Sequence, residues 1–226
     1  NRSYFATMMV ELGDADAMVC GVYTKYTDAI KPALEIVGTR DGISNIAALN
    51  IVNTPKGTYF LSDTLVNNHP SADTLEEIVK LTNDSVKLFN VDPVIAMLSY
   101  SNFGADSTGS PVTVHKAVES LHKNHPEILV DGEMQVNFAL DKELRSQTYP
   151  FSKLEGKDVN TLIFPNLSSA NIAYKTLLSM GLAENVGPIQ MGLKKPIYVC
   201  EPEASVRDII NIVTIAVIDA QINSNK

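Results

Sequence analysis

The chain has 226 residues, 45% of them hydrophobic and 19% charged, and its formal net charge is −8. This composition is typical of a globular protein with a large buried core, and it argues against a disordered chain. A nucleic-acid groove is excluded as well, because neutralising phosphates requires a clustered surplus of Lys and Arg that this acidic chain lacks.

No membrane-spanning segment is expected. The longest apolar stretch, 209–220, is interrupted by Asn211, Thr214 and Asp219. It is also shorter than the roughly 20 residues needed to cross a bilayer.

The two cysteines and the first residues indicate the setting of the protein. Cys20 and Cys200 match no metal-binding or redox spacing. We therefore expect two small buried hydrophobes, no bound metal and a reducing, cytoplasmic environment. The chain begins with Asn1 and enters a helical pattern at once, so we expect it to be part of a longer polypeptide.

The first predicted elements are a helix, a strand and a second helix. Apolar residues recur at helical spacing from Phe5 to Leu12, and Gly13 follows where a left-handed helix end is common. A short apolar strand is expected over 17–22 and a helix over 28–37. Next, the apolar runs 46–52 and 58–61 flank Asn53-Thr54-Pro55-Lys56-Gly57, which predicts a hairpin and hence a mixed sheet.

From residue 72 onward, helical and strand patterns alternate regularly, which is typical of a layered α/β protein with a largely parallel sheet. The expected elements are helix 72–89, strand 94–98, a helix after Pro111 ending near His122, strand 128–130, helix 136–144, strand 161–164, helix 169–180, a strand near Ile197 and helix 206–222. The last of these is apolar on more than one side. We therefore expect it either to lie at the centre of its domain or to meet a partner subunit.

Polar residues follow three of the predicted strands, where α/β sheets place ligands near helix N-termini. These loops are 99–104, 131–135 and 165–171. Ordinary turns and helix caps are the favoured interpretation, with ligand binding as the alternative. The ligand-binding candidates are Ser99, Ser101, Asn102, Asn166, Ser168 and Asn171.

Two groups of titratable residues suggest chemistry only weakly. Asp131 and Glu133 could form a carboxylate pair for a metal or for acid/base work, but a solvated turn is favoured. His115, His122 and His125 lack the spacing of a metal-binding helix, so surface positions are expected for them.

Several segments together resemble the phosphotransacetylase (phosphate acetyltransferase) family, in an order and spacing that cover nearly the whole chain. They are 4–10 with 13–17, 31–37, 96–101, 131–135, 162–167 with 170–175, and 187–189 with 195–196. Finer details resemble the version of this family that is fused behind bacterial malic enzymes. These details are Ser101-Asn102-Phe103-Gly104, Gly192-Leu193-Lys194-Lys195-Pro196 and Val217-Ile218-Asp219-Ala220-Gln221.

The resemblance implies two α/β domains with a cleft between them in which CoA and acetyl phosphate meet. One domain would be split, comprising 1–41 with 191–226 and incomplete at its N-terminus, and the other would be continuous over 42–190. It also implies a homodimer. An NADP-dependent malic-enzyme portion in the same chain would hold the NADP and a divalent metal.

The family's chemistry uses an aspartate to deprotonate the CoA thiol and a Ser-Arg pair to polarise acetyl phosphate. Counting along the matching segments places the aspartate at Asp208 and the pair at Glu201-Pro202. These two residues supply no cation, and Glu201 adds a negative charge against an anionic substrate. An arginine of the family corresponds to Lys31, which keeps the charge but loses the bidentate fork.

The role of Asp208 and the function of the chain therefore stay open at this point. Ser205-Val206-Arg207-Asp208 has the spacing of a helix capping box, so Asp208 is either a cap or a residue of a retained ligand site. The first hypothesis is a regulatory and assembly module that binds acetyl-CoA or a related metabolite. The alternatives are an active phosphate acetyltransferase and a purely structural dimerisation module.

Overall fold

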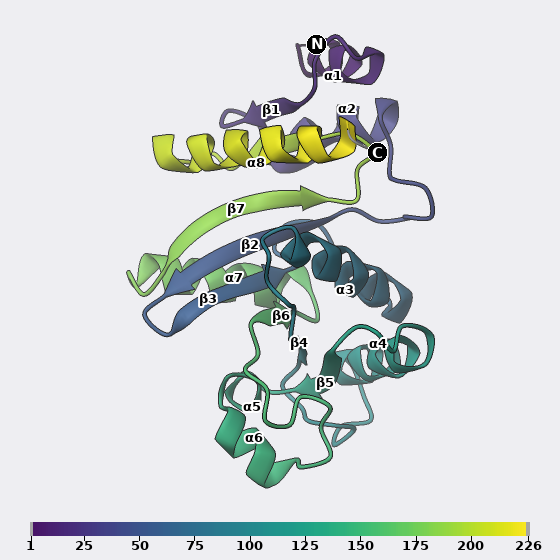
Figure 1. The fold of residues 1–226 in the computed structure, drawn as a ribbon, viewed down its shortest axis with the longest axis vertical. Helices are drawn as coiled ribbons and strands as arrows, with labels where there is room; N and C mark the ends of the chain where they lie inside the picture. The colour runs from purple at the N-terminus through teal and green to yellow at the C-terminus, as the bar shows by residue number, and fades with distance from the viewer. Residues whose placement is uncertain (1, 225–226) are drawn as a thin grey trace. The chain divides into compact units, whose positions relative to one another are not determined.

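A computed structural model describes residues 2–224, which divide into two compact units. Unit 1 comprises residues 1–50 and 185–226, and unit 2 comprises residues 51–184. Within each unit, helices and strands alternate as predicted for an α/β protein (Figure 1). The domain boundaries implied by the family resemblance, after residues 41 and 190, stay a prediction.

Unit 1 is built around a small parallel sheet. Strands β1 (Met18–Gly21) and β8 (Ile197–Cys200) pair in parallel, with Met18 opposite Ile197. Helices α1 (Arg2–Leu12), α2 (Tyr26–Ile36) and α8 (Val206–Ser224) belong to the same unit, as do residues 47–50 and 185–191. Gly13 follows α1 with φ +83°, as expected for a left-handed helix end.

Of the two alternatives expected for α8, a place at the centre of its domain is not what unit 1 shows, and contact with a partner subunit stays a prediction. The helix buries one stripe, formed by Ile212, Ala216 and Ala220 at spacings of four residues. Other apolar side chains remain largely exposed, among them Ile210 at 59% and Val217 at 49%. The four-residue spacing fits a helix lying on a surface, because residues i and i+4 share one face.

A six-stranded sheet has the order β5-β4-β6-β3-β2-β7. Its strands are β2 (Ala47–Thr54), β3 (Gly57–Ser62), β4 (Ile95–Leu98), β5 (Val130–Met134), β6 (Thr161–Ile163) and β7 (Glu184–Met191). Strand β6 pairs in parallel with β3 and β4, and β4 pairs in parallel with β5. The predicted hairpin is present, with Pro55 and Lys56 at the turn between β2 and β3.

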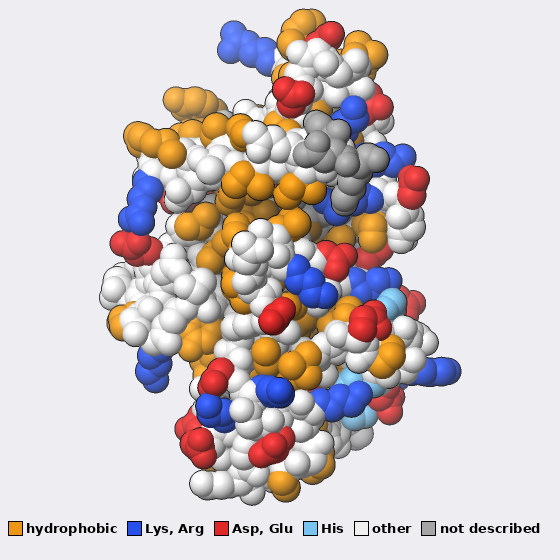
Figure 2. All heavy atoms as spheres, in the orientation of Figure 1, with side chains coloured by type: hydrophobic (Ala, Val, Ile, Leu, Met, Phe, Trp, Pro, Cys, Tyr) orange, Lys and Arg blue, Asp and Glu red, His pale blue; other side chains and the backbone are white. Residues whose placement is uncertain are grey.

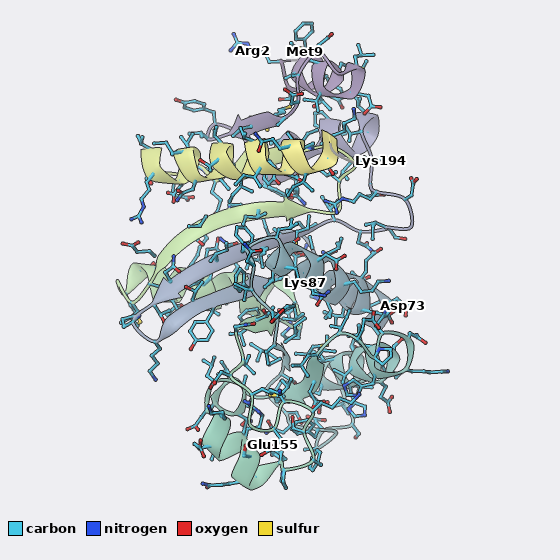
Figure 3. All side chains as sticks on the ribbon, in the orientation of Figure 1. Arg2, Met9, Asp73, Lys87, Glu155 and Lys194 are labelled. Carbon is cyan, nitrogen blue, oxygen red and sulfur yellow. The ribbon has the colours of Figure 1, made fainter. Side chains whose placement is uncertain are left out.

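Helices pack on both faces of this sheet within unit 2. On one face α3 (Ala72–Lys87) and α4 (Ser110–Asn124) pack against each other and against β3, β4 and β5. The opposite face carries α5 (Val136–Leu140) and α7 (Leu167–Ser179), with α6 (Lys142–Thr148) following α5. Helix α3 has Asp73 in its first turn and Lys87 in its last (Figure 3), which complements the helix dipole.

Three predicted elements differ from the structure. The expected helix over 136–144 is two short helices, because Asp141 ends α5 and caps α6 by accepting a hydrogen bond from Leu144 N at 2.9 Å. Strand β7 has no counterpart in the prediction. Strand β5 ends at Met134 rather than at 130, so that Asp131 and Glu133 lie inside it.

Candidate functional site

The carboxyl ends of four parallel strands bring polar loops to one edge of the unit 2 sheet. The loop after β4 holds Ser99, Ser101 and Asn102, and the loop after the neighbouring strand β6 leads to Asn166. Because neighbouring parallel strands end at the same edge, the topology places these loops together, as α/β ligand sites require.

In the loop after β4, side chains mainly hold the backbone. Ser99 Oγ accepts a hydrogen bond from Ser101 N at 3.2 Å, and Asn102 Oδ1 accepts one from Gln135 N at 2.8 Å. The Gln135 side chain in turn donates to Tyr100 O at 2.7 Å. Ser101 is buried. This loop is therefore tied to Gln135, directly after the end of β5.

The loop after β6 combines a helix cap with accessible polar groups. Asn166 is the N-cap of α7, and its Oδ1 accepts a hydrogen bond from Ser169 N at 3.0 Å. Ser168 is exposed in the first turn, and Asn171 is half-buried one turn later. The first turn of α7 thus presents the positive end of a helix dipole to an anion, although the N–H groups of Leu167 and Ser169 already have acceptors.

A third polar loop, after β3, was missed by the sequence analysis. Asp63 Oδ1 accepts hydrogen bonds from Leu65 N and Val66 N at 3.1 and 3.3 Å, and its Oδ2 accepts from Asn67 N at 2.7 Å. Asn67 O accepts from Leu167 N at 3.2 Å, which joins this loop to the start of α7. The sequence feature that could have indicated this loop is the polar segment Ser62-Asp63-Thr64, which follows the apolar residues of β3.

Asp131 and Glu133 are neither a solvated turn nor a carboxylate pair. Both are buried, Glu133 completely, and they have separate partners. Asp131 Oδ2 accepts from Ser152 Oγ at 2.7 Å and from the backbone N–H of residue 153 at 2.8 Å. Glu133 accepts from Gly104 N at 2.6 Å and pairs with His115 Nδ1 at 3.0 Å. Their role is to fix the loops that surround β5.

The three clustered histidines were expected on the surface, but they are partly buried and paired. His115 contacts Glu133 as described, and His122 Nε2 lies 2.8 Å from Val130 O. His125 lies 3.4 Å from Glu76. No group of His, Cys, Asp and Glu among residues 2–224 has an arrangement suited to a metal ion.

In unit 1, the residues that the sequence analysis assigned to the family's catalytic positions follow β8. Glu201 and Pro202 lie directly after Cys200, and Asp208 lies in the first turn of α8. Asp208 Oδ2 accepts hydrogen bonds from Ser205 N at 2.8 Å and Ser205 Oγ at 2.7 Å, and Asp208 N donates to Ser205 Oγ at 3.2 Å. The predicted capping box is therefore present, with Asp in the place of the usual Glu.

The other charged or nucleophilic candidates of unit 1 have ordinary environments. Lys31 is exposed on α2 and pairs with Glu35 at 3.7 Å, four residues along the helix. Burial raises the pKa of Cys20 from 9.0 to about 11, with a smaller contribution from Cys200. Burial, followed by the charge of Asp208, raises the pKa of Cys200 as well. Neither thiol is an activated nucleophile at neutral pH.

Comparison with known proteins decides the family. The phosphate acetyl/butaryl transferase family matches residues 1–217. The chain belongs to this family. It is 38% identical over 98% of its length to an NADP-dependent malic enzyme of Escherichia coli, of which it covers 29%. This chain thus spans less than a third of the length of the malic enzyme that it matches.

Family members of other kinds are similar over the same range. A phosphate acetyltransferase of Clostridium acetobutylicum is 35% identical over 96% of the chain, which covers 67% of that enzyme. The crystal structure of a phosphotransacetylase from Streptococcus pyogenes superposes with a TM-score of 0.87 at 33% identity. This match covers 99% of the chain and 68% of that structure. The resemblance read from the sequence and the predicted fold class are both confirmed.

The helices and the surface charge bear on two expectations from the sequence, one about a membrane-spanning segment and one about nucleic-acid binding. Among residues 2–224, no helix is long and apolar enough to cross a membrane. On the face drawn in Figure 2, acidic and basic side chains are interspersed rather than gathered by sign. Such a surface offers no extended basic stripe to a nucleic-acid backbone.

Proposed function

We propose that this chain is a regulatory and assembly module that binds acetyl-CoA or a related metabolite and does not transfer acetyl groups. In the whole protein it would follow a malate-oxidising, decarboxylating unit in the cytoplasm, and that unit would hold the NADP and the divalent metal. Its similarity to the matching region of malic enzymes supports this placement.

The start of α8 carries the proposal. Asp208, at the position of the family's base, accepts two hydrogen bonds from Ser205 through Oδ2 and so closes a helix end. Glu201 and Pro202 stand where the family's Ser-Arg pair is expected. Neither side chain brings a cation or an N–H donor to the oxyanion that forms during acetyl transfer, and such donors supply much of the rate of acyl-transfer enzymes.

The unit 2 loops support retained ligand binding. The first turn of α7 presents an exposed Ser168 at the positive end of the helix dipole, next to the Asn166 cap. A CoA phosphate suits such a helix N-terminus. Regulation also requires that the ligand bind two states of the whole enzyme with different affinities, because equal binding shifts no equilibrium.

A thermal-shift series on the chain with CoA, acetyl-CoA and acetyl phosphate, each tested separately, examines binding. A ligand present at about 100 times its dissociation constant should add roughly 2.7 kcal/mol of stability. Ser168→Asp places a negative charge at the α7 N-terminus and should reduce this gain. Ser179→Asp adds the same charge at the other end of α7 and should not. Absence of any shift, with no heat on titration of acetyl-CoA, would favour a purely structural module.

The competing function is an active phosphate acetyltransferase, favoured by the similarity to enzymes of that name. A coupled assay that supplies CoA and acetyl phosphate distinguishes the two. Turnover of the order of 100 per second by the unaltered chain would overturn the regulatory proposal.

A further inference from the structure

Three aromatic rings form a cluster on unit 2, next to the polar loop after β4. Phe103 follows Asn102 in that loop, and Tyr149 and Phe151 follow α6. The ring centroid of Phe103 lies 4.8 Å from that of Tyr149 and 5.1 Å from that of Phe151. These are the distances of favourable aromatic pairs. Phe151 is nevertheless 69% exposed, so the cluster presents aromatic surface to solvent.

The backbones that carry these rings are held by the two buried acidic residues of β5. Phe103 N donates to Glu133 O at 2.8 Å, and the Glu133 carboxylate accepts from the following backbone N–H at 2.6 Å. Asp131 Oδ2 accepts from Ser152 Oγ at 2.7 Å and from the next backbone N–H at 2.8 Å, directly after Phe151. Acidic residues are seldom fully buried, and here both fix a segment that bears an aromatic ring.

Phe103 adopts a backbone conformation that is unfavourable for a bulky residue. Its φ of +46° lies in the left-handed region, which side chains with a Cβ rarely enter. The two hydrogen bonds to Glu133 hold it there, and its ring also packs against the core of unit 2. Strain of this kind is concentrated at sites where a surface is preorganised for binding. The aromatic surface is therefore rigid before any ligand arrives, which lowers the entropic cost of binding.

A rigid, exposed aromatic surface with positive charge beside it suits a nucleotide. Nucleobases stack on aromatic side chains, and every base offers a face for such stacking. The segment 149–157, which contains Phe151, has the exposed Lys153 and Lys157 against Glu155. This is a local excess of positive charge in a chain whose net charge is −8. Phosphate groups attached to a stacked base would be attracted to it.

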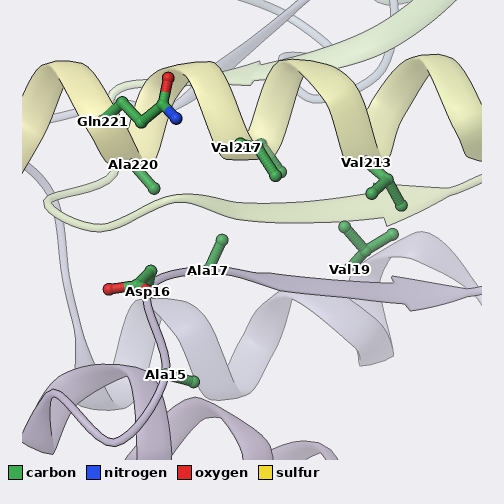
Figure 4. A pocket seen from close by; sticks show the side chains of 9 residues that line it. Ala15, Asp16, Ala17, Val19, Val213, Val217, Ala220 and Gln221 are labelled. Carbon is green, nitrogen blue, oxygen red and sulfur yellow. The ribbon is translucent and has the colours of Figure 1, made fainter.

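The apolar groove of unit 1 has neither feature. It lies between the segment 15–19 and α8, where Val217 faces Ala17 (Figure 4). None of the described residues that line it is aromatic or basic, and Asp16 would repel a phosphate. The aromatic cluster of unit 2 is therefore the better place for a nucleotide.

We propose that Phe103, Tyr149 and Phe151 form a stacking surface for the adenine ring of a nucleotide, with the exposed ring of Phe151 making the contact. This assignment rests on the proposed function in taking acetyl-CoA as the source of the adenine ring. A free adenine nucleotide has the same ring and carries phosphate as well, and the experiment below separates the two sources.

Fluorescence provides the first test, because the chain contains no tryptophan. In Phe151→Trp, stacking of adenine on the introduced indole should quench its emission when acetyl-CoA or AMP is titrated. Phe5→Trp is the matched control, because Phe5 is a phenylalanine of α1 with a similar exposure of 71%. It should show no saturable quenching. S-acetylpantetheine, which lacks the nucleotide, should quench neither variant.

Calorimetry provides the second test. Phe151→Ala should raise the dissociation constant of acetyl-CoA about tenfold, because a stacking partner is lost, and should leave that of S-acetylpantetheine unchanged. Phe151→Tyr keeps an aromatic ring and should bind like the parent, as should Phe5→Ala. Circular dichroism checks that each variant is folded, which the exposed positions of both phenylalanines favour.

The possible outcomes separate this assignment from the proposed function. If acetyl-CoA binds, but Phe151→Ala binds it equally well and Phe151→Trp is not quenched, the stacking surface is wrong and the proposed function stands. Quenching by AMP with no tighter binding of acetyl-CoA would support the stacking surface and assign it to free adenine nucleotides. Absence of binding by both AMP and acetyl-CoA would overturn the two together.

Discussion

Ser205 and Asp208 close the start of α8 by hydrogen bonding in both directions. Asp208 N donates to Ser205 Oγ at 3.2 Å, and Ser205 N donates to Asp208 Oδ2 at 2.8 Å. Two of the backbone N–H groups that a helix start leaves unpaired are thereby satisfied. The residue that we expect at the position of the family's base therefore caps a helix in this chain.

Loss of the Ser205 side chain should cost stability. Ser205→Ala removes the acceptor of Asp208 N, and we expect the free energy of unfolding to fall by about 1 kcal/mol. Urea denaturation followed by circular dichroism measures this change. Ser179→Ala, in the last turn of α7, is the control and should change stability by less than about 0.5 kcal/mol. Equal stability of Ser205→Ala and the parent would show that water replaces the cap at no cost.

The elements predicted best are those whose ends are marked by a capping or terminating residue in the sequence itself. Helix α8 begins at its capping box, and α1 ends at Gly13, so both could be placed closely. Strand β7 was missed because Gly187 and Pro188 interrupt its apolar run, and both residues disfavour a strand interior. Its pairing with β2 depends on residues more than 100 positions away, which no local pattern records.

The buried carboxylates show why the site was harder to predict than the fold. Charged residues are seldom fully buried, so Asp131 and Glu133 were assigned to a turn. Their partners lie roughly 20 or 30 residues away in sequence, at Ser152 for Asp131 and at Gly104 for Glu133. Only the folded chain brings donors and acceptors together. The order of the family-like segments, by contrast, was readable along the sequence, whereas the placement of the family's catalytic positions on Glu201, Pro202 and Asp208 stays a prediction.

Arg145 should be required for the stability of unit 2. It is completely buried, and its guanidinium donates to the carbonyl oxygens of Phe138, Ala139, Leu154 and Lys157. Arg145→Lys retains one cation but cannot reach all of these acceptors, because the ammonium group is compact.

We expect Arg145→Lys to lower the free energy of unfolding by about 3 kcal/mol or more, since buried carbonyls left unpaired cost about 1 to 3 kcal/mol each. Chemical denaturation provides the measurement. Arg2→Lys on the exposed surface of α1 (Figure 3) is the matched control and should be neutral within about 0.5 kcal/mol. A loss below about 1 kcal/mol at Arg145 would mean that water or repacking satisfies the carbonyls.

Cys20 should react slowly with thiol reagents in the folded protein. Its pKa is raised from 9.0 to about 11, so the thiolate fraction at pH 8 falls by about a hundredfold. The rate of modification by a disulfide reagent should fall by a similar factor relative to the chain in urea. Fast labelling of Cys20 in the native Cys200→Ser variant would contradict the raised pKa.

The raised pKa of Cys20 also predicts that the protein loses stability as the pH rises. Because the folded pKa lies above the unfolded value, the contribution of the Cys20 thiol to stability is complete below pH 9 and is lost as the pH rises toward 11. Cys20→Ser should remove that part of the alkaline loss of stability, measured by denaturation at pH 8 and at pH 10.5.

The last prediction tests why acetyl transfer is absent from the proposed function. If Glu201 and Pro202 are the reason that the chain does not transfer acetyl groups, the double variant Glu201→Ser, Pro202→Arg should restore activity. It supplies a hydrogen-bond donor and a positive charge where the carbonyl oxyanion forms. Loss of one such donor costs roughly 2.7 to 4 kcal/mol in known enzymes, so its return should raise the rate about a hundred- to a thousandfold. The coupled assay with CoA and acetyl phosphate measures it.

Asp208 would then have to act as the base, in competition with its hydrogen bonds to Ser205. Asp208→Asn in the double variant should abolish the restored activity, whereas Glu203→Gln, close by on the same loop, should leave it unchanged. Circular dichroism and ligand-induced thermal shifts must match the parent, because Pro202 also restricts the local backbone. If the unaltered chain already transfers acetyl groups efficiently and the double variant is no faster, the substitutions at 201 and 202 do not explain the chemistry, and another cation must supply the missing charge.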